Sequence, residues 1–189
     1  DGDSLWKDRP DLYVDLSAIA KGYGVDQLAV MLEASGIDRY LVDIGGEVRG
    51  RGFNESGRAW RVGIEKPLEN ARAVREVIAL ESGAMATSGD YRNFYEVDGM
   101  RISHTVDART GQPIRHRLAA VTVVADDCMD ADAWATALNV LGPRRGFEVA
   151  IGNQLAALFV IREPDGRFTE KVTPEFVAAR ERSRIISKK

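Results

Sequence analysis

Cysteine and histidine are scarce in this sequence. Its 189 residues include one cysteine, Cys128, and two histidines, His104 and His116. A single cysteine cannot form an intramolecular disulfide, so the sequence contains no disulfide framework. Two histidines leave little room for a His-rich zinc site.

A basic excess and a long apolar run are also missing. The net charge of -3 and the pI near 5.5 argue against a nucleic-acid partner, because binding a phosphate backbone requires a basic surface. No apolar run approaches the roughly 20 residues that a membrane-spanning helix needs. Apolar residues make up 44% and charged residues 29% of the chain, which is ordinary for one globular domain of this length.

The distribution of apolar residues predicts an α+β fold. A helix is expected over residues 15–36, with apolar side chains at helical spacing and Gly36 as its stop. Strands are expected over residues 39–44, 45–53, 58–64, 73–81, 118–125 and 156–161, and a hairpin over residues 93–103 with its turn at Asp98-Gly99. Further helices are expected over residues 128–142, 144–153 and 173–184. Strands grouped with few helices between them favour α+β over a regular βαβ series.

The segment "CMDADAWATALNVLG", residues 128–142, contains the first candidate site. On a helix, Asp132, Thr136 and Asn139 share one face, opposite Trp134 and Leu138. One interpretation is a solvated polar face. The other is a site for a hard cation such as Mg²⁺, since no charged residue lies between positions 133 and 143 and alanines flank the Asp132/Thr136 pair. The acidic residues Asp126, Asp127 and Asp130 are expected to cap this helix.

A second candidate is "DLSAIAKGYG", residues 15–24. Lys21 lies near a helix start, behind small residues and before a glycine, which is compatible with an anion or phosphate site. By itself the signal is weak, because an exposed lysine in a first helical turn is more often solvated than functional. Asp15 would cap the segment or accept a hydrogen bond from a ligand. The spacing is not that of a P-loop.

The third candidate is His104, which follows the predicted hairpin and precedes a loop over residues 104–114 that contains Asp107. A histidine beside a carboxylate is suited to act as a general base, and a packed histidine with one hydrogen bond is the alternative. His116 is expected to be exposed and structural. Residues 43–52 are glycine-rich and allow close backbone approach, and residues 85–96 form either a ligand loop or an ordinary turn.

Five blocks of the sequence, in this order, resemble the ApbE family of flavin transferases (FAD:protein FMN transferases, formerly called thiamine biosynthesis lipoproteins). They are "DLSAIAKGYGVD", "YLVDIGGEVRGRG", "WRVGIEKP", "TSGDYRNFYEVDGMRISHTVDARTGQPI" and "DADAWATALNVLG". The resemblance extends from about Asp15 to the final helix. It implies a T-fold-like α+β architecture with mostly antiparallel strands, in one domain over residues 1–189 that lacks the N-terminal portion of the family.

The resemblance also implies chemistry. Family members use Mg²⁺ and FAD, transfer FMN to a Ser or Thr hydroxyl of an acceptor flavoprotein, such as a subunit of a membrane redox complex, and release AMP. The metal ligands correspond to Asp132, Thr136 and the backbone carbonyl of Ala18. The FAD contacts correspond to Asp15, Lys21 and Val106, and the proposed base corresponds to His104. The family's further acidic residue before the threonine is Ala135 here.

The resemblance favours an exported protein, periplasmic or anchored at the inner membrane. Two other functions stay open at this stage. One is an FAD pyrophosphatase in which water replaces the acceptor hydroxyl, and the other is a flavin-binding module without catalysis.

Overall fold

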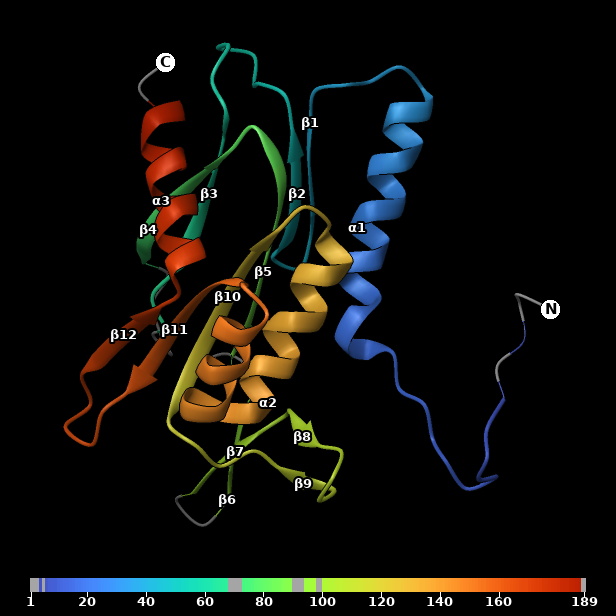
Figure 1. The fold of residues 1–189 in the computed structure, drawn as a ribbon, viewed down its shortest axis with the longest axis vertical. Coiled ribbons are helices and arrows are strands. Elements are labelled where there is room, and N and C mark those ends of the chain that lie inside the picture. Colours follow the sequence, from blue (N-terminus) through green and yellow to red (C-terminus); the bar gives the residue numbers. More distant parts are fainter. Residues whose placement is uncertain (1–3, 5, 68–72, 90–93, 98–99, 188–189) are drawn as a thin grey trace.

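The computed structural model describes the whole chain except residues 1–3, 5, 68–72, 90–93, 98–99 and 188–189. At its centre is a six-stranded antiparallel sheet in the order β1-β2-β5-β10-β11-β12 (Figure 1). These strands span Tyr40–Ile44 (β1), Glu47–Arg51 (β2), Ser82–Gly89 (β5), Leu118–Ala125 (β10), Ala156–Arg162 (β11) and Phe168–Val172 (β12).

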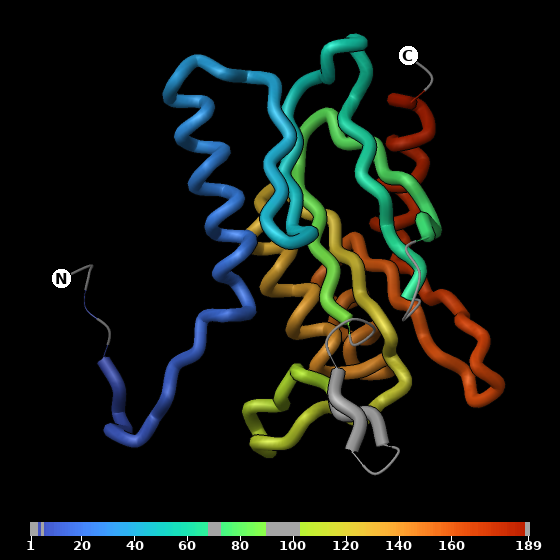
Figure 2. Tube along the Cα trace, turned by 180° about the vertical axis from the view of Figure 1, so that it is seen from behind, coloured from blue at the N-terminus to red at the C-terminus, as the bar shows by residue number. Residues whose placement is uncertain are grey.

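Helices cover the two faces of the sheet unequally. Helices α1 (Ser17–Ala34) and α2 (Cys128–Gly152) lie side by side on one face, and α3 (Pro174–Ile186) lies on the other with the hairpin β3–β4 (Trp60–Glu65 and Val74–Leu80). Figure 2, seen from behind, places that hairpin in front of the sheet. Strand β10 is buried on both faces, which explains its continuous apolar sequence.

Helix α2 consists of two helical segments joined at Gly142. Gly142 has φ 77°, outside helical geometry, and Pro143 begins the next segment. His116 stabilises this break in α2, because its Nε2 lies 2.6 Å from the Asn139 carbonyl oxygen. Its Nδ1 accepts from the Leu118 N–H. The sequence prediction of two helices separated at Gly142-Pro143 is confirmed. His116 is structural as expected, but it is half-buried and not exposed.

Two short antiparallel pairs follow β5 at the lower end of Figure 1. They are β6–β7 (Phe94–Val97 and Met100–Ser103) and β8–β9 (Val106–Asp107 and Gln112–Pro113). The predicted hairpin is confirmed in its strands, and its turn at Asp98-Gly99 lies outside the described residues.

The prediction of a loop or turn over residues 85–96 is wrong for its first part. Residues 85–89 belong to β5, where small side chains pack between the layers. The loop predicted over residues 104–114 is confirmed for most of its length, and it also contains the two-residue strands of the β8–β9 pair. The Asp107 carboxylate accepts from the Arg109 N–H and Gly111 has φ 66°, which together close the tight turn between these strands.

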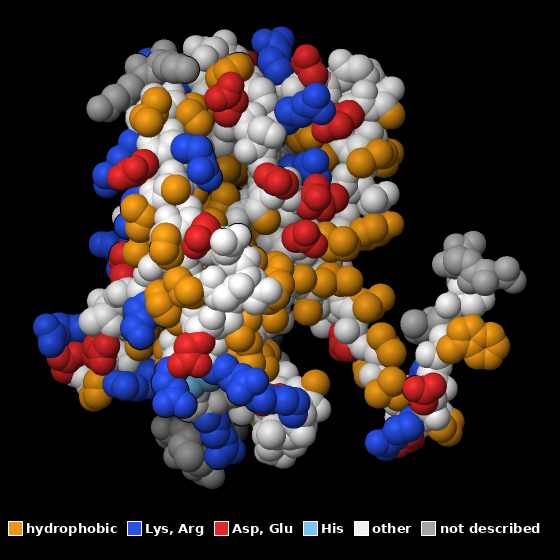
Figure 3. All heavy atoms as spheres, viewed as in Figure 1, with side chains coloured by type: hydrophobic (Ala, Val, Ile, Leu, Met, Phe, Trp, Pro, Cys, Tyr) orange, Lys and Arg blue, Asp and Glu red, His pale blue; other side chains and the backbone are white. Residues whose placement is uncertain are grey.

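Helix α1 is apolar on both of its faces, and only one face is covered in this structure. Val25 and Ala29 are fully buried, whereas Tyr23, Val30 and Met31 are more than half exposed. Figure 3 shows hydrophobic side chains along the outer edge of this helix. Gly36 ends the helical region with φ 77° as predicted, and the Ile37 N–H bonds back to the Leu32 carbonyl. None of the helices that the structure describes is long and apolar enough to span a bilayer.

Candidate functional site at the α1–α2 junction

Gly22 lets helices α1 and α2 touch. A β-carbon at Gly22 would come within 2.4 Å of the Cys128 carbonyl oxygen, so no larger residue fits without a shift of backbone. The Gly22 N–H donates to Asp132 Oδ2 at 3.0 Å. Asp132 is only 3% exposed, so the interpretation of its face as solvated is wrong for this residue.

Ala18 lies at the same junction. In an α-helix the N–H of one residue points at the carbonyl four residues earlier, which for Gly22 is the carbonyl of Ala18. Asp132 accepts from this same N–H, so its carboxylate contacts α1 one turn after Ala18. The hydrogen bond joins two segments that are 110 positions apart in the sequence, and the role of the Ala18 carbonyl as a metal ligand stays a prediction.

Thr136 lies one turn further along α2 and is half-buried. Its Oγ1 is 2.9 Å from the Oγ of Ser88, the penultimate residue of β5. This contact fixes the threonine side chain against the end of the sheet. Ser88 was not singled out by the sequence, because a serine in a turn-like run carries no specific signal.

Lys21 and Glu47 form an ion pair at the junction. Lys21 Nζ lies 2.6 Å from Glu47 Oε2, with the lysine side chain 48% exposed and the glutamate side chain 3% exposed. Lys21 is therefore paired, where the sequence left open a purely solvated side chain. Glu47 was missed by sequence reasoning; its only signal is a charge placed directly after the paired glycines Gly45 and Gly46.

The charge balance of the junction suits a divalent cation. Burial raises the pKa of the Asp132 carboxyl, and the Gly22 N–H and the Lys21 charge offset this only in part. Burial also raises the pKa of Glu47, against the lowering effect of Lys21. An ionised carboxylate removed from water costs several kcal/mol unless a counter-charge is near. A carboxylate, a hydroxyl and a backbone carbonyl are ligands that Mg²⁺ accepts, so the residues present fit this ion.

No group of three or more His, Cys, Asp or Glu side chains suited to a metal occurs among the described residues. The Ala18, Asp132 and Thr136 set is of a different kind, since it has one carboxylate and two neutral oxygens. Ala135, between Asp132 and Thr136, is fully buried in the core beneath α2.

Asp15, Val106 and His104 are all exposed residues. Asp15 Oδ1 accepts from the Ser17 N–H at 2.7 Å, at the first residue of α1. Hydrogen bonds from the Ser17 side chain and backbone lower the pKa of Asp15. Val106 is 49% exposed in β8, and His104 is exposed in the segment between β7 and β8. A shallow cavity of about 500 Å³ is lined by Asp107 and Gln112 of the β8–β9 pair and by Val140 of α2. The β8–β9 pair therefore lies near α2. The roles predicted for these three residues stay predictions.

Asp127 and Asp130 lie at the start of α2 as expected, where acidic side chains favour the helix dipole, but the side-chain cap of Asp127 is missing. Asp127 occupies the N-cap position without a side-chain cap bond and pairs with Arg49 instead. The cap comes from Asp26 on α1, whose carboxylate accepts from Cys128 N at 3.0 Å and Met129 N at 2.8 Å. Asp26 also pairs with Arg49 at 2.6 Å, which joins α1, α2 and β2 in one network.

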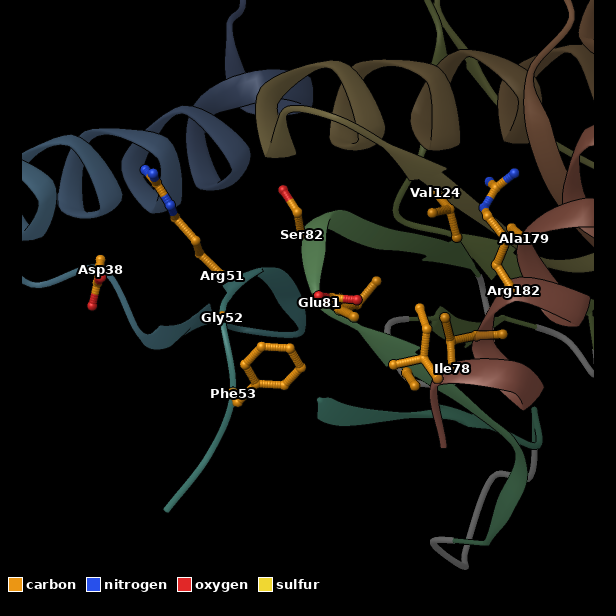
Figure 4. Close-up of a pocket in the computed structure, with 13 residues that line it drawn as sticks. Asp38, Arg51, Gly52, Phe53, Ile78, Glu81, Ser82, Val124, Ala179 and Arg182 are labelled. Atoms are coloured by element: carbon orange, nitrogen blue, oxygen red, sulfur yellow. The ribbon is translucent and has the colours of Figure 1, made fainter. Parts of the chain in front are cut away.

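A cavity of about 530 Å³ lies at the opposite end of β5, beside Ser82 and the end of α3 (Figure 4). None of the predicted site residues lines it. Its Arg51 points toward α1, where it pairs with Glu33 at 2.9 Å. The converging polar groups at the α1–α2 junction make that junction the stronger candidate site.

Comparison with known proteins identifies the family of this chain. A sequence model described as the ApbE family matches residues 1–159. The chain belongs to the ApbE family. It is 49% identical over 176 residues to an FAD:protein FMN transferase of Vibrio cholerae, which covers 93% of this chain and 52% of that protein. A protein of the same name from Escherichia coli K12 is 47% identical over 91% of this chain and 49% of its own length.

Solved structures of the ApbE family share the fold. The flavin transferase ApbE from Vibrio cholerae has a TM-score of 0.81 at 48% identity, covering 91% of this chain and 54% of that one. The apo flavinyl transferase ApbE of Pseudomonas stutzeri has a TM-score of 0.79 at 43% identity, covering 89% and 52%. The predicted α+β, mostly antiparallel ApbE architecture is confirmed. The chain spans about half the length of the relatives it matches.

Proposed function

We propose that this chain forms part of an FAD:protein FMN transferase. In this reaction the hydroxyl oxygen of a Ser or Thr on an acceptor flavoprotein attacks the FMN phosphorus of FAD. The pyrophosphate bond breaks and AMP leaves with the bridging oxygen. The observation that carries the proposal is the buried Asp132 carboxylate, held by the Gly22 N–H where α1 meets α2.

Each residue of the junction has a chemical task in this proposal. Ala18, Asp132 and Thr136 would hold Mg²⁺, which when bound neutralises charge on the pyrophosphate. Ser88 fixes the Thr136 hydroxyl at 2.9 Å. Lys21, whose side chain is half exposed, would meet the phosphates, and the exposed residues Asp15 and Val106 would make further contacts with FAD. His104, exposed on its loop, takes the proton of the attacking hydroxyl.

The test is incubation of the protein with FAD, Mg²⁺ and an unmodified acceptor domain whose target Ser or Thr carries a free hydroxyl. Flavin fluorescence that stays on the acceptor in a denaturing gel, together with stoichiometric AMP, supports the proposal. The control is an acceptor that a full-length relative does flavinylate. If FAD stays intact with this acceptor, the proposal is contradicted, and the remaining function is that of a flavin-binding module.

Hydrolysis is the second candidate, favoured by the exposure of His104 to solvent. If water replaces the acceptor hydroxyl, the products are free FMN and AMP in equal amounts without any acceptor. A membrane redox complex as the source of the acceptor, and an exported, periplasmic or membrane-anchored location, complete the proposal and rest on family resemblance.

A further inference from the structure

Glu47 is a buried carboxylate to which the proposed reaction assigns no role. It is 2% exposed and begins β2 directly after the turn at Gly45 and Gly46. Within the described part of the chain, its Oε2 atom has no hydrogen-bond donor other than the Lys21 ammonium. A carboxylate in this position needs its partner, because an unpaired buried charge is strongly destabilising.

The turn before Glu47 positions its carboxylate next to Lys21. Gly45 and Gly46 have φ of 67° and 105°, and Ile44 pairs with Glu47 across a two-residue connection, which is the geometry of a primed hairpin turn. The Asp43 carboxylate fixes the turn by accepting from the Gly46 N–H at 2.9 Å. A β-carbon at Gly45 would lie 3.6 Å from Lys21 Cδ and 3.7 Å from Glu47 Oε2, so the turn runs alongside the pair.

The ion pair is asymmetric in a way that suits ligand binding. Glu47 is buried and fixed at the start of a strand, whereas about half of the Lys21 side chain faces solvent. An ammonium has three donors, and the contact with Glu47 occupies one of them. The others remain for an anion that approaches from the exposed side. A pair needed only to join α1 to β2 would duplicate the Arg49–Asp26 pair, which already does so at 2.6 Å.

We propose that Glu47 is a positioning residue that holds the Lys21 ammonium at the mouth of the α1–α2 junction, where it meets the pyrophosphate of FAD. This inference deepens the proposed function and rests on it for the identity of the anion. Glu47 itself touches neither substrate nor metal. Without it, the flexible lysine side chain would spread over many rotamers, and ordering it on binding would weaken affinity.

The direction in which Glu47→Gln changes FAD affinity distinguishes a positioning role from a purely electrostatic one. Glu47→Gln removes a negative charge near the anion, so a purely electrostatic role predicts tighter FAD binding. A positioning role predicts weaker binding by roughly fivefold, because a neutral amide holds the ammonium less well. Glu47→Asp keeps the charge but shortens the side chain by one methylene, and we expect a similar loss. Because burial raises the pKa of Glu47, a neutral side chain is tolerated there and the Gln variant is expected to fold.

The experiment is a double-mutant cycle of Lys21→Met and Glu47→Gln, with FAD dissociation constants measured by flavin fluorescence in EDTA. Lys21→Met alone should weaken binding about tenfold. In the Lys21→Met background, Glu47→Gln should change nothing or tighten binding, since no ammonium remains to be held. Glu76→Gln is the matched control, because it breaks a partly buried pair with Arg180 on the other face of the sheet and should leave FAD affinity unchanged.

Additive losses in the cycle, or tighter binding by Glu47→Gln alone, would overturn the positioning role. If the losses of FAD affinity are coupled but no flavin is transferred, the positioning role is supported and the transferase proposal is contradicted. No FAD binding by the unsubstituted protein would overturn both. Thermal melts of each variant show whether a loss of affinity is merely a loss of fold.

Discussion

Gly22 and Cys128 are in such close contact that a β-carbon on the glycine would lie 2.4 Å from the cysteine carbonyl oxygen. Gly22→Ala is therefore expected to separate α1 from α2 and to lower the free energy of unfolding by about 1–3 kcal/mol, measured by urea denaturation. FAD binding should weaken in parallel, because separating the helices would break the hydrogen bond from the backbone N–H of residue 22 to Asp132. Gly152→Ala is the control: nothing lies within 4 Å of its added carbon, so no loss is expected. Equal stability of the two variants would contradict the close contact.

Asp26 should be the residue that caps α2. Asp26→Ala removes the acceptor for Cys128 N and Met129 N and also the ion pair of Asp26 with Arg49, which keeps its pair with Asp127. A loss of about 1–2 kcal/mol in unfolding free energy is expected. Asp127→Ala, at the nominal N-cap position, should cost less, because its side chain makes no cap bond. The same urea titrations decide the order, and a larger loss for Asp127→Ala would refute it.

Asp132→Asn should abolish stabilisation by Mg²⁺. A metal bound at 100 times its dissociation constant stabilises the folded state by about 2.7 kcal/mol, which raises the melting temperature measurably. The variant keeps the shape of the side chain but not its charge, so its melting temperature should not respond to Mg²⁺. Asp130→Asn, on the same helix near its start, should respond as the unsubstituted protein does. If Asp132→Asn still responds, the proposed ligand set is incorrect.

His104→Ala should remove transfer while sparing FAD affinity. The expectation follows from its place on an exposed segment outside the α1–α2 contact, where it can accept a proton without supporting the core. Loss of covalent flavin on the acceptor by about 10²-fold or more, with an unchanged dissociation constant for FAD, is the predicted pattern. A variant that transfers at the normal rate would eliminate the base role.

Cys128 provides a pH test of the junction. Burial raises the pKa of its thiol to about 12, from an ordinary value of 9.0. The folded pKa is higher than the unfolded one, so the thiol's contribution to stability is complete below pH 9 and is lost as the pH rises toward 12. Between these values stability should fall by at most about 1.4 kcal/mol per pH unit more than in Cys128→Ala. Parallel stability curves for the two proteins would show that the thiol is accessible.

The sequence predicts most elements of this fold because their signals are local. The helix stop at Gly36, the break at Gly142-Pro143 and the apolar run of β10 are each readable within a few residues. Strand β5 was missed because its small side chains have weak strand preference, and only packing between the layers selects the extended form.

The candidate site shows the same limit more clearly. The pairing of Asp132 with Thr136 follows from helical spacing, but its burial depends on Gly22, 110 positions away. The helix cap from Asp26 and the ion pair of Lys21 with Glu47 also join distant segments, and no local pattern reports them. The resemblance of five sequence blocks to the ApbE family predicted the metal ligands, but it did not predict these contacts between distant segments.

The hydrogen bond from Gly22 to Asp132 also makes one amide proton a spectroscopic reporter. That proton lies where α1 meets α2, beside the predicted ligands, so its chemical shift and its exchange with deuterium depend on the charge carried by a single carboxylate. In an amide-labelled sample, the Gly22 resonance would follow occupancy of the junction directly, without any flavin and without turnover.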